Sequence, residues 1–365
     1  MRLTRLEVSN VRNLEQVALE PGPGLNLLYG DNGAGKTALL EAVHLLGRGR
    51  SFRTHRIRQV IRRGEDQSLV RAELELSRGQ SSQLALQRSL TTGVQLRVDG
   101  HPVSKLSEIA ARLPLQVMLP DVSDLVFGSA TERRQFLDWG MFHVKHQYHG
   151  LLRDYLRVLK QRNAWLRSQM EGSKGNDPWI HQFVELAGGL DSMRKEYISH
   201  LSDALIEAAA SLGMDLDLEL KYAQGWREGV SPKELVNVLA EQLPREVKLG
   251  ATQSGPHRAD LVIRALGAVA AQQVSRGQGK VISSALNIAQ ARLLNELTER
   301  TSVFLIDDLG AELDRTRSHH LYRLLADMGC QVFATAVEPP RDIEAFSDHL
   351  TLFHVKQGAI RRIEE

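Results

Sequence analysis

The chain has 365 residues, 42% of them hydrophobic, and a formal net charge of only +2 at pH 7. This length suits one large domain or two modest ones, and the near-neutral balance means that any basic surface is local rather than global. The one cysteine, Cys330, excludes an internal disulfide framework and fits a reducing cytoplasm, and no apolar run is long enough for a membrane span.

Strands and a buried helix are predicted at the start of the chain. Residues 3–8 alternate between apolar and polar, as in a strand, and residues 13–20 read as a second strand. Residues 25–29 form a short apolar run, which is typical of a buried strand. Residues 38–46 are apolar on nearly every turn, as expected of a buried helix.

Residues 30–37, between that strand and that helix, have the form G-x-x-x-x-G-K-[ST] of a P-loop. Its glycines let backbone N–H groups approach phosphates, and the helix N-terminus adds a partial positive charge. We expect Lys36 to reach the β- and γ-phosphates and the Thr37 hydroxyl to bind Mg²⁺; the alternative is a glycine-rich turn that binds nothing. The candidate nucleotide ligands are Gly30, Asp31, Asn32, Gly33, Ala34, Gly35, Lys36 and Thr37.

An arginine-rich segment follows the predicted helix. Seven arginines lie within residues 48–63, and no acidic residue occurs between Glu41 and Glu65. The missing counterions favour a surface that meets phosphates, although such a block is also typical of a solvated loop. The candidate DNA contacts are Arg48, Arg50, Arg53, Arg56 and Arg58.

Alternating apolar residues predict an antiparallel sheet over residues 70–76, 84–86 and 94–98. A short helix is expected at 104–113 and a strand at 115–119.

The pattern changes between about residues 131 and 244, where apolar residues recur every three or four positions. The polar stretch 171–178 separates two such stripes, which predicts a helical hairpin with arms of roughly 45–55 Å. Its aromatic residues are expected to face the neighbouring helix.

Polar motifs return after Pro244. The turn 254–261 is consistent with a nucleotide or DNA role or with simple loop packing.

The apolar strand 303–306 ends on Asp307 and Asp308, as a Mg²⁺-nucleotide site requires opposite its P-loop. One acid would hold the metal and the other would accept a proton from the attacking water; the alternative is that both cap the following turn. Thr335, near the end of a second apolar strand, is a further candidate catalytic residue.

These motifs together resemble the RecF family, within the ABC-type ATPase heads of the SMC and Rad50 class. The resemblance covers nearly the whole chain. The segments that carry it, besides the P-loop, are residues 50–54 (RSFRT), 133–138 (RRQFLD), 255–258 (GPHR), 275–278 (SRGQ) and 307–314 (DDLGAELD). The family's turn usually reads T-G-P-H-R-D-D, and Ser254 and Ala259 depart from it here.

The resemblance implies an α/β fold: an ABC-type P-loop ATPase head of mixed sheets with flanking helices, and an inserted helical-hairpin arm. The head would comprise residues 1–130 and 245–365, and the arm residues 131–244. Two subunits of such heads sandwich two ATP molecules.

The resemblance also implies roles for particular residues. Asp307 would bind the metal and Asp308 would orient or deprotonate the water. Asp314 would lie at the dimer interface, and Gln116 is the candidate for the metal-binding glutamine of ABC heads. The residues implied to contact the partner's γ-phosphate are Ser275, Gly277 and Gln278.

The function implied by the resemblance is ATP-dependent DNA binding in recombinational repair, with slow DNA-stimulated hydrolysis. An ATP-driven homodimer would clamp duplex DNA near single-strand/double-strand junctions and, with RecO and RecR, load RecA. Two alternatives are a nucleotide-binding subunit of a membrane transporter and another SMC- or Rad50-like DNA-tethering ATPase. The Asp at position 308, where transporters normally carry Glu, and the short hairpin argue against them.

Overall fold

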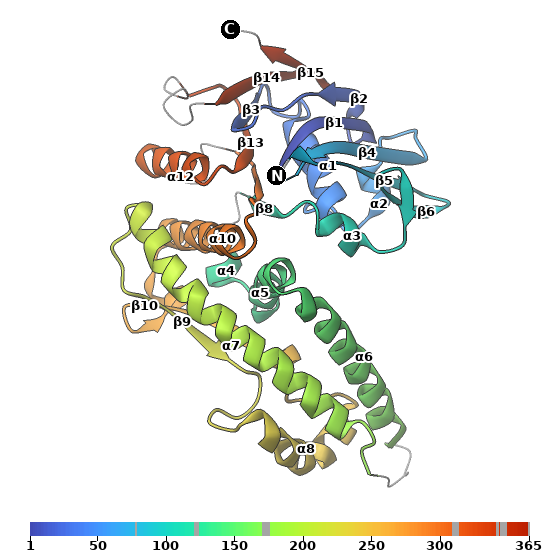
Figure 1. Ribbon diagram of the computed structural model, residues 1–365, viewed down its shortest axis with the longest axis vertical. Helices are drawn as coiled ribbons and strands as arrows, with labels where there is room; N and C mark the ends of the chain where they lie inside the picture. Colours follow the sequence, from blue (N-terminus) through green and yellow to red (C-terminus); the bar gives the residue numbers. More distant parts are fainter. Residues whose placement is uncertain are drawn as a thin grey trace. The chain divides into compact units, whose positions relative to one another are not determined.

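The computed structural model describes residues 1–76, 79–119, 124–169, 176–308, 314–340, 343 and 349–363 (Figure 1). The chain divides into two compact units. Unit 1 comprises Met1–Val122, Ala208–Met214 and Ser284–Glu365, and unit 2 comprises Ser123–Glu207 and Asp215–Ser283.

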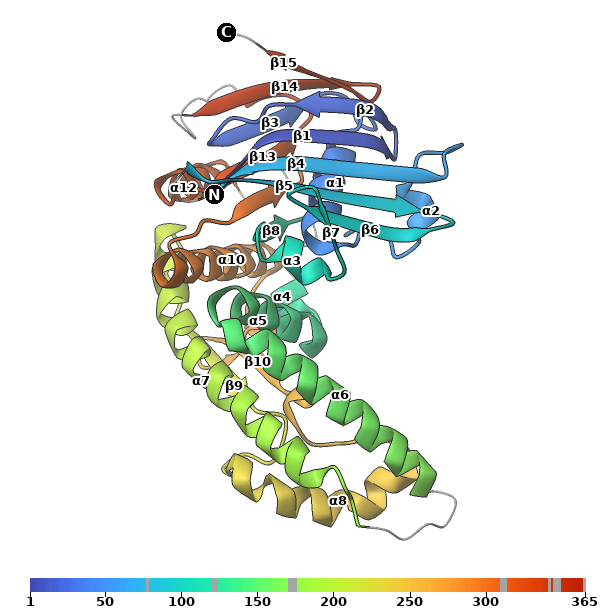
Figure 2. The ribbon, with the colours of Figure 1, turned by 45° about the vertical axis from the view of Figure 1, so that its right-hand side comes forward.

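Unit 1 contains an antiparallel sheet whose strands follow one another across space in the order β2 (Leu14–Leu19), β1 (Arg2–Val11), β4 (Gln67–Glu75), β5 (Ser81–Ser89), β6 (Gly93–Val98) and β7 (His101–Val103). Figure 2 shows β1, β4, β5 and β6 side by side. In β1, β4 and β5 buried residues alternate with more exposed ones, so one face of these strands enters the core and the other meets solvent. The predicted antiparallel sheet is confirmed.

The second sheet of unit 1 carries the predicted P-loop strand near its centre. Its order is β15 (Ala359–Ile363), β14 (Leu350–Lys356), β3 (Leu25–Tyr29), β13 (Gln331–Ala336), β12 (Val303–Ile306) and β8 (Leu115–Met118). All neighbouring pairs are parallel except β14 with β15. Because parallel strands end at the same edge, the loops after β3, β12 and β13 meet there.

Helix α1 (Lys36–Arg48) lies between the two sheets and contacts both. It is buried along almost its whole length, as its apolar sequence predicts. The core cluster around it unites side chains from both sheets, including Leu6, Val70 and Phe333. Within the described residues, unit 1 also contains α2 (Ile57–Val60), α3 (Leu106–Ala110) and α12 (Arg315–Asp327), with most of α10 (Arg276–Thr298), which starts in unit 2.

Unit 2 is built on long helices, α6 (His146–Gln169) and α7 (Ile180–Ser211), which form the predicted hairpin. Their 24 and 32 residues correspond to about 36 and 48 Å at 1.5 Å per residue. The rings of Tyr155 and Phe183 contact each other in a tilted arrangement with their centroids 5.1 Å apart, and both side chains are buried, so the prediction that the aromatics form core is confirmed.

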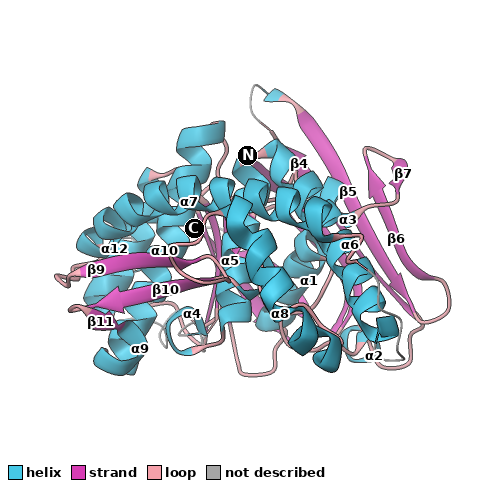
Figure 3. Ribbon diagram, turned by 90° about the horizontal axis from the view of Figure 1, so that it is seen from below, coloured by secondary structure: helices cyan, strands magenta, loops and turns pink. Residues whose placement is uncertain are grey.

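The described part of unit 2 also contains α4 (Asp124–Phe127), α5 (Ala130–Val144), α8 (Leu235–Leu249), α9 (Ala270–Gln273) and the 3₁₀ turns Pro232–Glu234 and Pro256–Arg258. A small antiparallel sheet, β11 (Ala268–Val269), β10 (Asp260–Ala265) and β9 (Leu218–Ala223), completes it (Figure 3). None of the helices in the described ranges combines the length and apolarity needed to cross a bilayer.

The division of the chain differs from the boundary that the sequence suggested at residues 244–245. Residues 245–283 belong to unit 2 because hydrogen bonds tie them to its helices. Arg133 of α5 forms a bidentate ion pair with Asp260, both bonds 2.8 Å, and Arg134 donates to the carbonyl of Ala259 at 2.7 Å. The segment 133–138 therefore binds the residues that directly follow the segment 255–258 within unit 2.

Candidate nucleotide site

The predicted P-loop connects β3 to α1 in the expected strand–loop–helix order. Gly33 and Gly35 have φ angles of 79° and 121°, a left-handed region that only glycine adopts without strain. The Lys36 side chain folds back over the loop, and its Nζ donates hydrogen bonds to the carbonyls of Gly30 and Asp31, the latter at 2.9 Å. Burial lowers the pKa of Lys36, and the carboxylates of Asp307, Asp308 and Asp31 oppose that shift.

A polar cavity of about 320 Å³ opens at the P-loop. Its lining combines the loop, the ends of β12 and β13, the β1–β2 turn and the arginine-rich segment. The lining residues are Arg12, Asn13, Asn32, Gly33, Gly35, Lys36, Thr37, Ala38, Arg53, Asp307, Asp308, Thr335, Ala336 and Val337. This cavity is the candidate nucleotide site.

Thr37, Asp307 and Thr335 converge in this cavity from three elements. The Thr37 hydroxyl donates to Asp307 Oδ1 at 2.9 Å, and the Thr335 hydroxyl donates to the same oxygen at 2.7 Å. The backbone N–H of Asp308 donates to Thr335 Oγ1 at 2.8 Å. Residues 270 positions apart in the sequence thus share one hydrogen-bonded set at the carboxyl edge of the sheet.

The chemistry of this set fits Mg²⁺. Mg²⁺ prefers oxygen ligands and is usually held by one or two carboxylates together with substrate phosphates. Among the described residues there is no group of three or more His, Cys, Asp or Glu side chains that could hold a metal ion. Thr37 and Asp307 are the side chains here that would hold the ion next to nucleotide phosphates.

Asp308 adopts a left-handed backbone conformation with φ of 59°. Such conformations cost of order 1–3 kcal/mol in residues other than glycine and concentrate at functional sites. The Thr335 hydroxyl, which accepts the Asp308 N–H, helps to hold it. The segment 309–313 of the predicted motif lies outside the described residues.

A buried carboxylate supports the arginine wall of the cavity. Glu41 is fully buried in α1, and Arg12 contacts it with two hydrogen bonds of 2.7 Å. Ser51 also donates to Glu41 and accepts the backbone N–H groups of Arg53 and Thr54. The Arg53 guanidinium lies 3.9 Å from Glu41 with half of its side chain exposed. Sequence reasoning missed this cluster.

The candidate DNA-binding arginines fall into different environments. Arg48 is half-buried, its guanidinium donates to the carbonyl of Leu115 at 2.8 Å, and burial lowers its pKa. This placement argues against a DNA contact. Arg53 faces the nucleotide cavity, whereas Arg50, Arg56 and Arg58 are exposed.

Gln116 also lies where its predicted role is impossible. Its side chain is buried in β8 and donates to Gln290 Oε1 of α10 at 3.0 Å. It does not line the cavity. The prediction that Gln116 binds the metal is therefore wrong, because a polar residue in this apolar strand has a hydrogen-bonding partner within the core.

The predicted signature segment begins α10. Ser275 precedes the helix and is exposed; its N–H donates to Gln278 Oε1 at 2.9 Å, and its hydroxyl accepts the N–H of Gln278 at 3.2 Å. This reciprocal pair is a capping box, and the expectation that Ser275 lies just before a helix is confirmed. Gly277 lies in the exposed first turn.

Asp314 caps α12 by accepting the N–H of Arg317 at 3.0 Å, and this bond lowers the pKa of the carboxyl. It is exposed to solvent, as an interface residue of an isolated chain would be.

The 254–261 turn is packed inside unit 2 rather than open to a ligand. His257 accepts the Tyr155 hydroxyl at Nδ1, 2.6 Å away, and donates from Nε2 to the carbonyl of Thr252 at 3.1 Å. Burial is the main cause that lowers the pKa of His257 to about 4. Of the two readings of this turn, the contacts favour loop packing.

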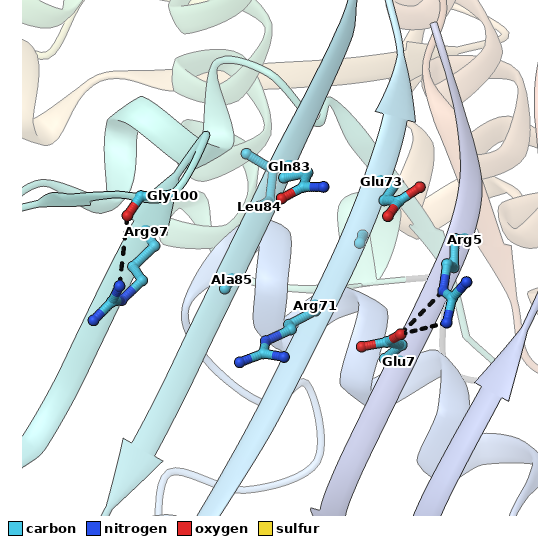
Figure 4. A pocket seen from close by; sticks show the side chains of 10 residues that line it. Arg5, Glu7, Arg71, Glu73, Gln83, Leu84, Ala85, Arg97 and Gly100 are labelled. Carbon is cyan, nitrogen blue, oxygen red and sulfur yellow. Dashed lines mark hydrogen bonds and ion pairs between the residues drawn. The ribbon is translucent and has the colours of Figure 1, made fainter.

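A second hollow, of about 300 Å³, lies on the solvent face of the antiparallel sheet (Figure 4). Strand register places Glu7, Arg71, Ala85 and Arg97 in one row across it. Arg5 pairs with Glu7 at 2.8 Å. No residue singled out from the sequence lies there, and its mixed charges give it no phosphate-binding character comparable with the P-loop cavity.

Comparisons with known proteins agree with this geometry. Residues 2–361 match the model of the RecF/RecN/SMC N-terminal domain family. The chain is 41% identical to the DNA replication and repair protein RecF of Pseudomonas aeruginosa, over 99% of this chain and 97% of that one. It is 39% identical to the protein of the same name from Shewanella baltica, over the full length of both.

Solved structures add similarity in three dimensions. One described as the recombination mediator protein RecF with ATP in the RecFOR pathway superimposes with a TM-score of 0.88 at 26% identity, covering 99% of this chain and 97% of that chain. An SMC head bound to a domain of ScpA, at 14% identity and a TM-score of 0.61 over 100% of this chain and 97% of that chain, shares the fold. With its P-loop cavity, its ATPase-head fold and these full-length relatives, the chain belongs to the RecF family of DNA replication and repair proteins.

Proposed function

We propose that this chain is an ATP-dependent DNA-binding protein of recombinational repair, with weak, DNA-stimulated ATP hydrolysis. The observation that carries the proposal is the hydrogen-bonded set of Thr37, Asp307 and Thr335 beside the P-loop, inside a cavity large enough for nucleotide phosphates. The similar solved structure of a RecF with ATP supports ATP as the ligand.

In the proposed mechanism, P-loop N–H groups and Lys36 bind the phosphates, and Thr37 and Asp307 hold Mg²⁺. When bound there, Mg²⁺ would supply positive charge next to the transferred phosphoryl group. Asp308 orients the attacking water or accepts its proton, and Thr335 positions Asp308 through the bond to its N–H. Arg53, which faces the cavity, is better placed for the nucleotide than for DNA.

The proposed DNA surface uses the exposed part of the arginine-rich segment. Arg58, Arg62 and Arg63 line a hollow of about 620 Å³, and Arg56 is exposed close by in the sequence. Arg12 and Asn13 line both this hollow and the nucleotide cavity, so the two are neighbours within unit 1. The shared residues support coupling between DNA contact and nucleotide state.

The proposed assembly is an ATP-dependent homodimer. Ser275 and its neighbouring N–H groups form an exposed helix N-terminus in unit 2, a natural anion site. The P-loop is in unit 1 and already has its own helix N-terminus. We assign the Ser275 site, with Gly277 and Gln278, to the γ-phosphate of a second subunit, and Asp314 to the same interface. ATP then holds the dimer together around duplex DNA near single-strand/double-strand junctions, where the protein acts with RecO and RecR in the cytoplasm to load RecA.

Binding of the purified chain to duplex and gapped DNA, measured with ATP, with ADP and without nucleotide, tests this function. The proposal predicts the tightest binding with ATP and preference for the gapped substrate. Affinity that is equal in all three nucleotide states would contradict the coupling.

Sedimentation of Ser275→Arg separates assembly from nucleotide binding. The added bulk and charge should abolish the ATP-dependent dimer while monomeric ATP binding stays nearly intact. A variant that still dimerises with ATP, or a wild-type dimer equally stable in ADP, would refute the role of Ser275.

A further inference from the structure

A phosphate-binding loop must turn its N–H groups toward the ligand, so its carbonyls must face elsewhere. Buried carbonyls need hydrogen-bond donors, and the donors therefore help to decide which way each peptide points. Lys36 serves the carbonyls of Gly30 and Asp31. The carbonyl of the buried Ala34 and the carbonyl of the exposed Gly33 receive donors from two segments distant in the sequence, so the burial argument applies to Ala34 in full.

Asn13, in the turn between β1 and β2, supplies the first donor. Its Nδ2 donates to the carbonyl of Gly33 at 3.1 Å. A Cβ added to Gly35 would lie 3.2 Å from the same Nδ2, so the Asn13 side chain packs directly against the loop.

The turn of the C-terminal hairpin supplies the second donor. The N–H of Gly358 donates to the carbonyl of Ala34 at 2.8 Å. Gln357 and Gly358 join β14 to β15 with φ angles of 49° and 83°, a two-residue turn with both central residues left-handed. The hairpin is held in place because β14 pairs with β3 and β15 runs beside β2 (Figure 2).

The fit at Gly358 leaves no room for a side chain. A Cβ there would lie 2.4 Å from the carbonyl oxygen of Asn13, a backbone atom that cannot move aside as a flexible side chain would. Gly358 is not among the residues that line the nucleotide cavity, so any effect it has on the nucleotide must pass through the loop.

We propose that the turn of the C-terminal hairpin, at Gly358, is part of the nucleotide-binding machinery. With Asn13, it fixes the Gly33 and Ala34 peptides so that the loop is ordered for phosphate before the nucleotide arrives. Gly358 and Asn13 are positioning residues, and the inference rests on the proposed binding of ATP by this loop.

A matched pair of glycine substitutions tests the proposal. Asp99 and Gly100 form a second two-residue hairpin turn in unit 1, with φ angles of 52° and 79° and nothing within 4 Å of a Cβ on Gly100. Gly358→Ala and Gly100→Ala therefore impose similar backbone strain, but only the first displaces a turn from the P-loop.

The measurements are the Kd of a fluorescent ATP analogue and of an ADP analogue, together with the Tm of each variant. We expect Gly358→Ala to raise the Kd of both nucleotides by roughly tenfold. This is the effect expected when the loop loses about one of the hydrogen bonds that order it. The affinity for both nucleotides should fall because both place a β-phosphate in the loop. Gly100→Ala should change either Kd by less than about twofold. Equal changes in Kd for the two variants would overturn the proposal.

Asn13 provides a milder second test if Gly358→Ala folds poorly. Asn13→Ala removes the donor to Gly33 without adding a charge to the cavity that Asn13 also lines, so it should weaken both nucleotides, by less than Gly358→Ala does. An Asn13→Ala variant that binds both nucleotides like wild type would contradict the positioning role.

Lys36→Ala distinguishes this inference from the proposed function. If wild type binds no nucleotide, or Lys36→Ala binds as well as wild type, the P-loop assignment fails. If Lys36→Ala loses binding but Gly358→Ala binds like wild type, only the role of the hairpin fails.

Discussion

Arginine and carboxylate side chains meet in both units of this chain, but with opposite consequences. In unit 2, Arg162 is fully buried and its guanidinium contacts Asp177, Glu246 and Thr252, each at 2.7 Å. In unit 1, Arg53 stands 3.9 Å from Glu41 with half of its side chain exposed, on the wall of a cavity.

The difference in burial and pairing between Arg162 and Arg53 distinguishes a charge that holds the fold together from a charge that is available to a ligand. A buried cation such as Arg162 is tolerated only as long as its hydrogen-bonding partners are present. A cation that faces an open polar cavity, as Arg53 does, can still bind an anion from solution. Residue type alone does not distinguish the two, whereas burial and pairing do.

Removal of one partner from the unit 2 cluster should have the largest effect. Glu246→Ala leaves the Arg162 charge buried and partly unpaired, which costs about 3–5 kcal/mol of unfolding free energy. Glu241 lies on the same helix in an exposed pair with Arg227, so Glu241→Ala should cost less than about 1 kcal/mol. Urea denaturation measures both. Similar losses of unfolding free energy in the two variants would contradict the distinction between buried and exposed pairs.

Acid should weaken unit 2 through His257. Its folded pKa of about 4 lies below the ordinary value of 6.5, so the unfolded chain binds more protons in this window. Stability is therefore fully present above pH 6.5 and is lost as the pH falls toward 4, by up to about 3 kcal/mol at 1.36 kcal/mol per pKa unit. His44 in α1, whose pKa burial lowers to about 3, adds a similar dependence in unit 1.

Urea titrations between pH 7.5 and 5 test this dependence. His257→Asn should be less stable than wild type at pH 7.5 because the bond to Tyr155 is lost, but its stability should fall less steeply with acid. An acid slope identical to that of wild type would show that His257 titrates normally.

The exposed arginines of unit 1 should have the smallest effect, on DNA rather than on stability. Arg56→Ala with Arg58→Ala should reduce the slope of log affinity against log salt by about 0.9 for each phosphate that the protein no longer binds. Arg5→Ala, in the mixed-charge hollow of Figure 4, is the control and should leave the slope unchanged. An unchanged slope in the double variant would mean that these arginines form only a solvated loop.

The candidate nucleotide site could be predicted because each part carries a local signal. The P-loop is one contiguous motif, and Asp307 follows an apolar strand that is recognisable by itself. Sheet topology then brings Thr37 within 2.9 Å of Asp307. The alternation in β4 and the stripes of α6 and α7 likewise revealed their elements.

The contacts that support the site could not be predicted from local patterns. Glu41 lies in an apolar helix, and the neighbouring sequence does not indicate that Arg12 is its partner. The ion pair of Arg133 with Asp260 joins segments 127 positions apart, although both motifs were recognised. Gln116 was misassigned because a polar residue in a strand gives no indication of whether its partner is a metal or Gln290.

The unit 1 cavity should bind ATP together with Mg²⁺ through Thr37 and Asp307, and every other proposed property depends on this. Calorimetric titration of ATP, with Mg²⁺ and with a chelator, into wild type and Asp307→Asn tests it most directly. We predict that Mg²⁺ tightens ATP binding to wild type and that Asp307→Asn, which keeps the side-chain shape but loses the charge, removes most of that gain. An Asp307→Asn variant whose ATP affinity responds to Mg²⁺ as strongly as wild type would contradict this role.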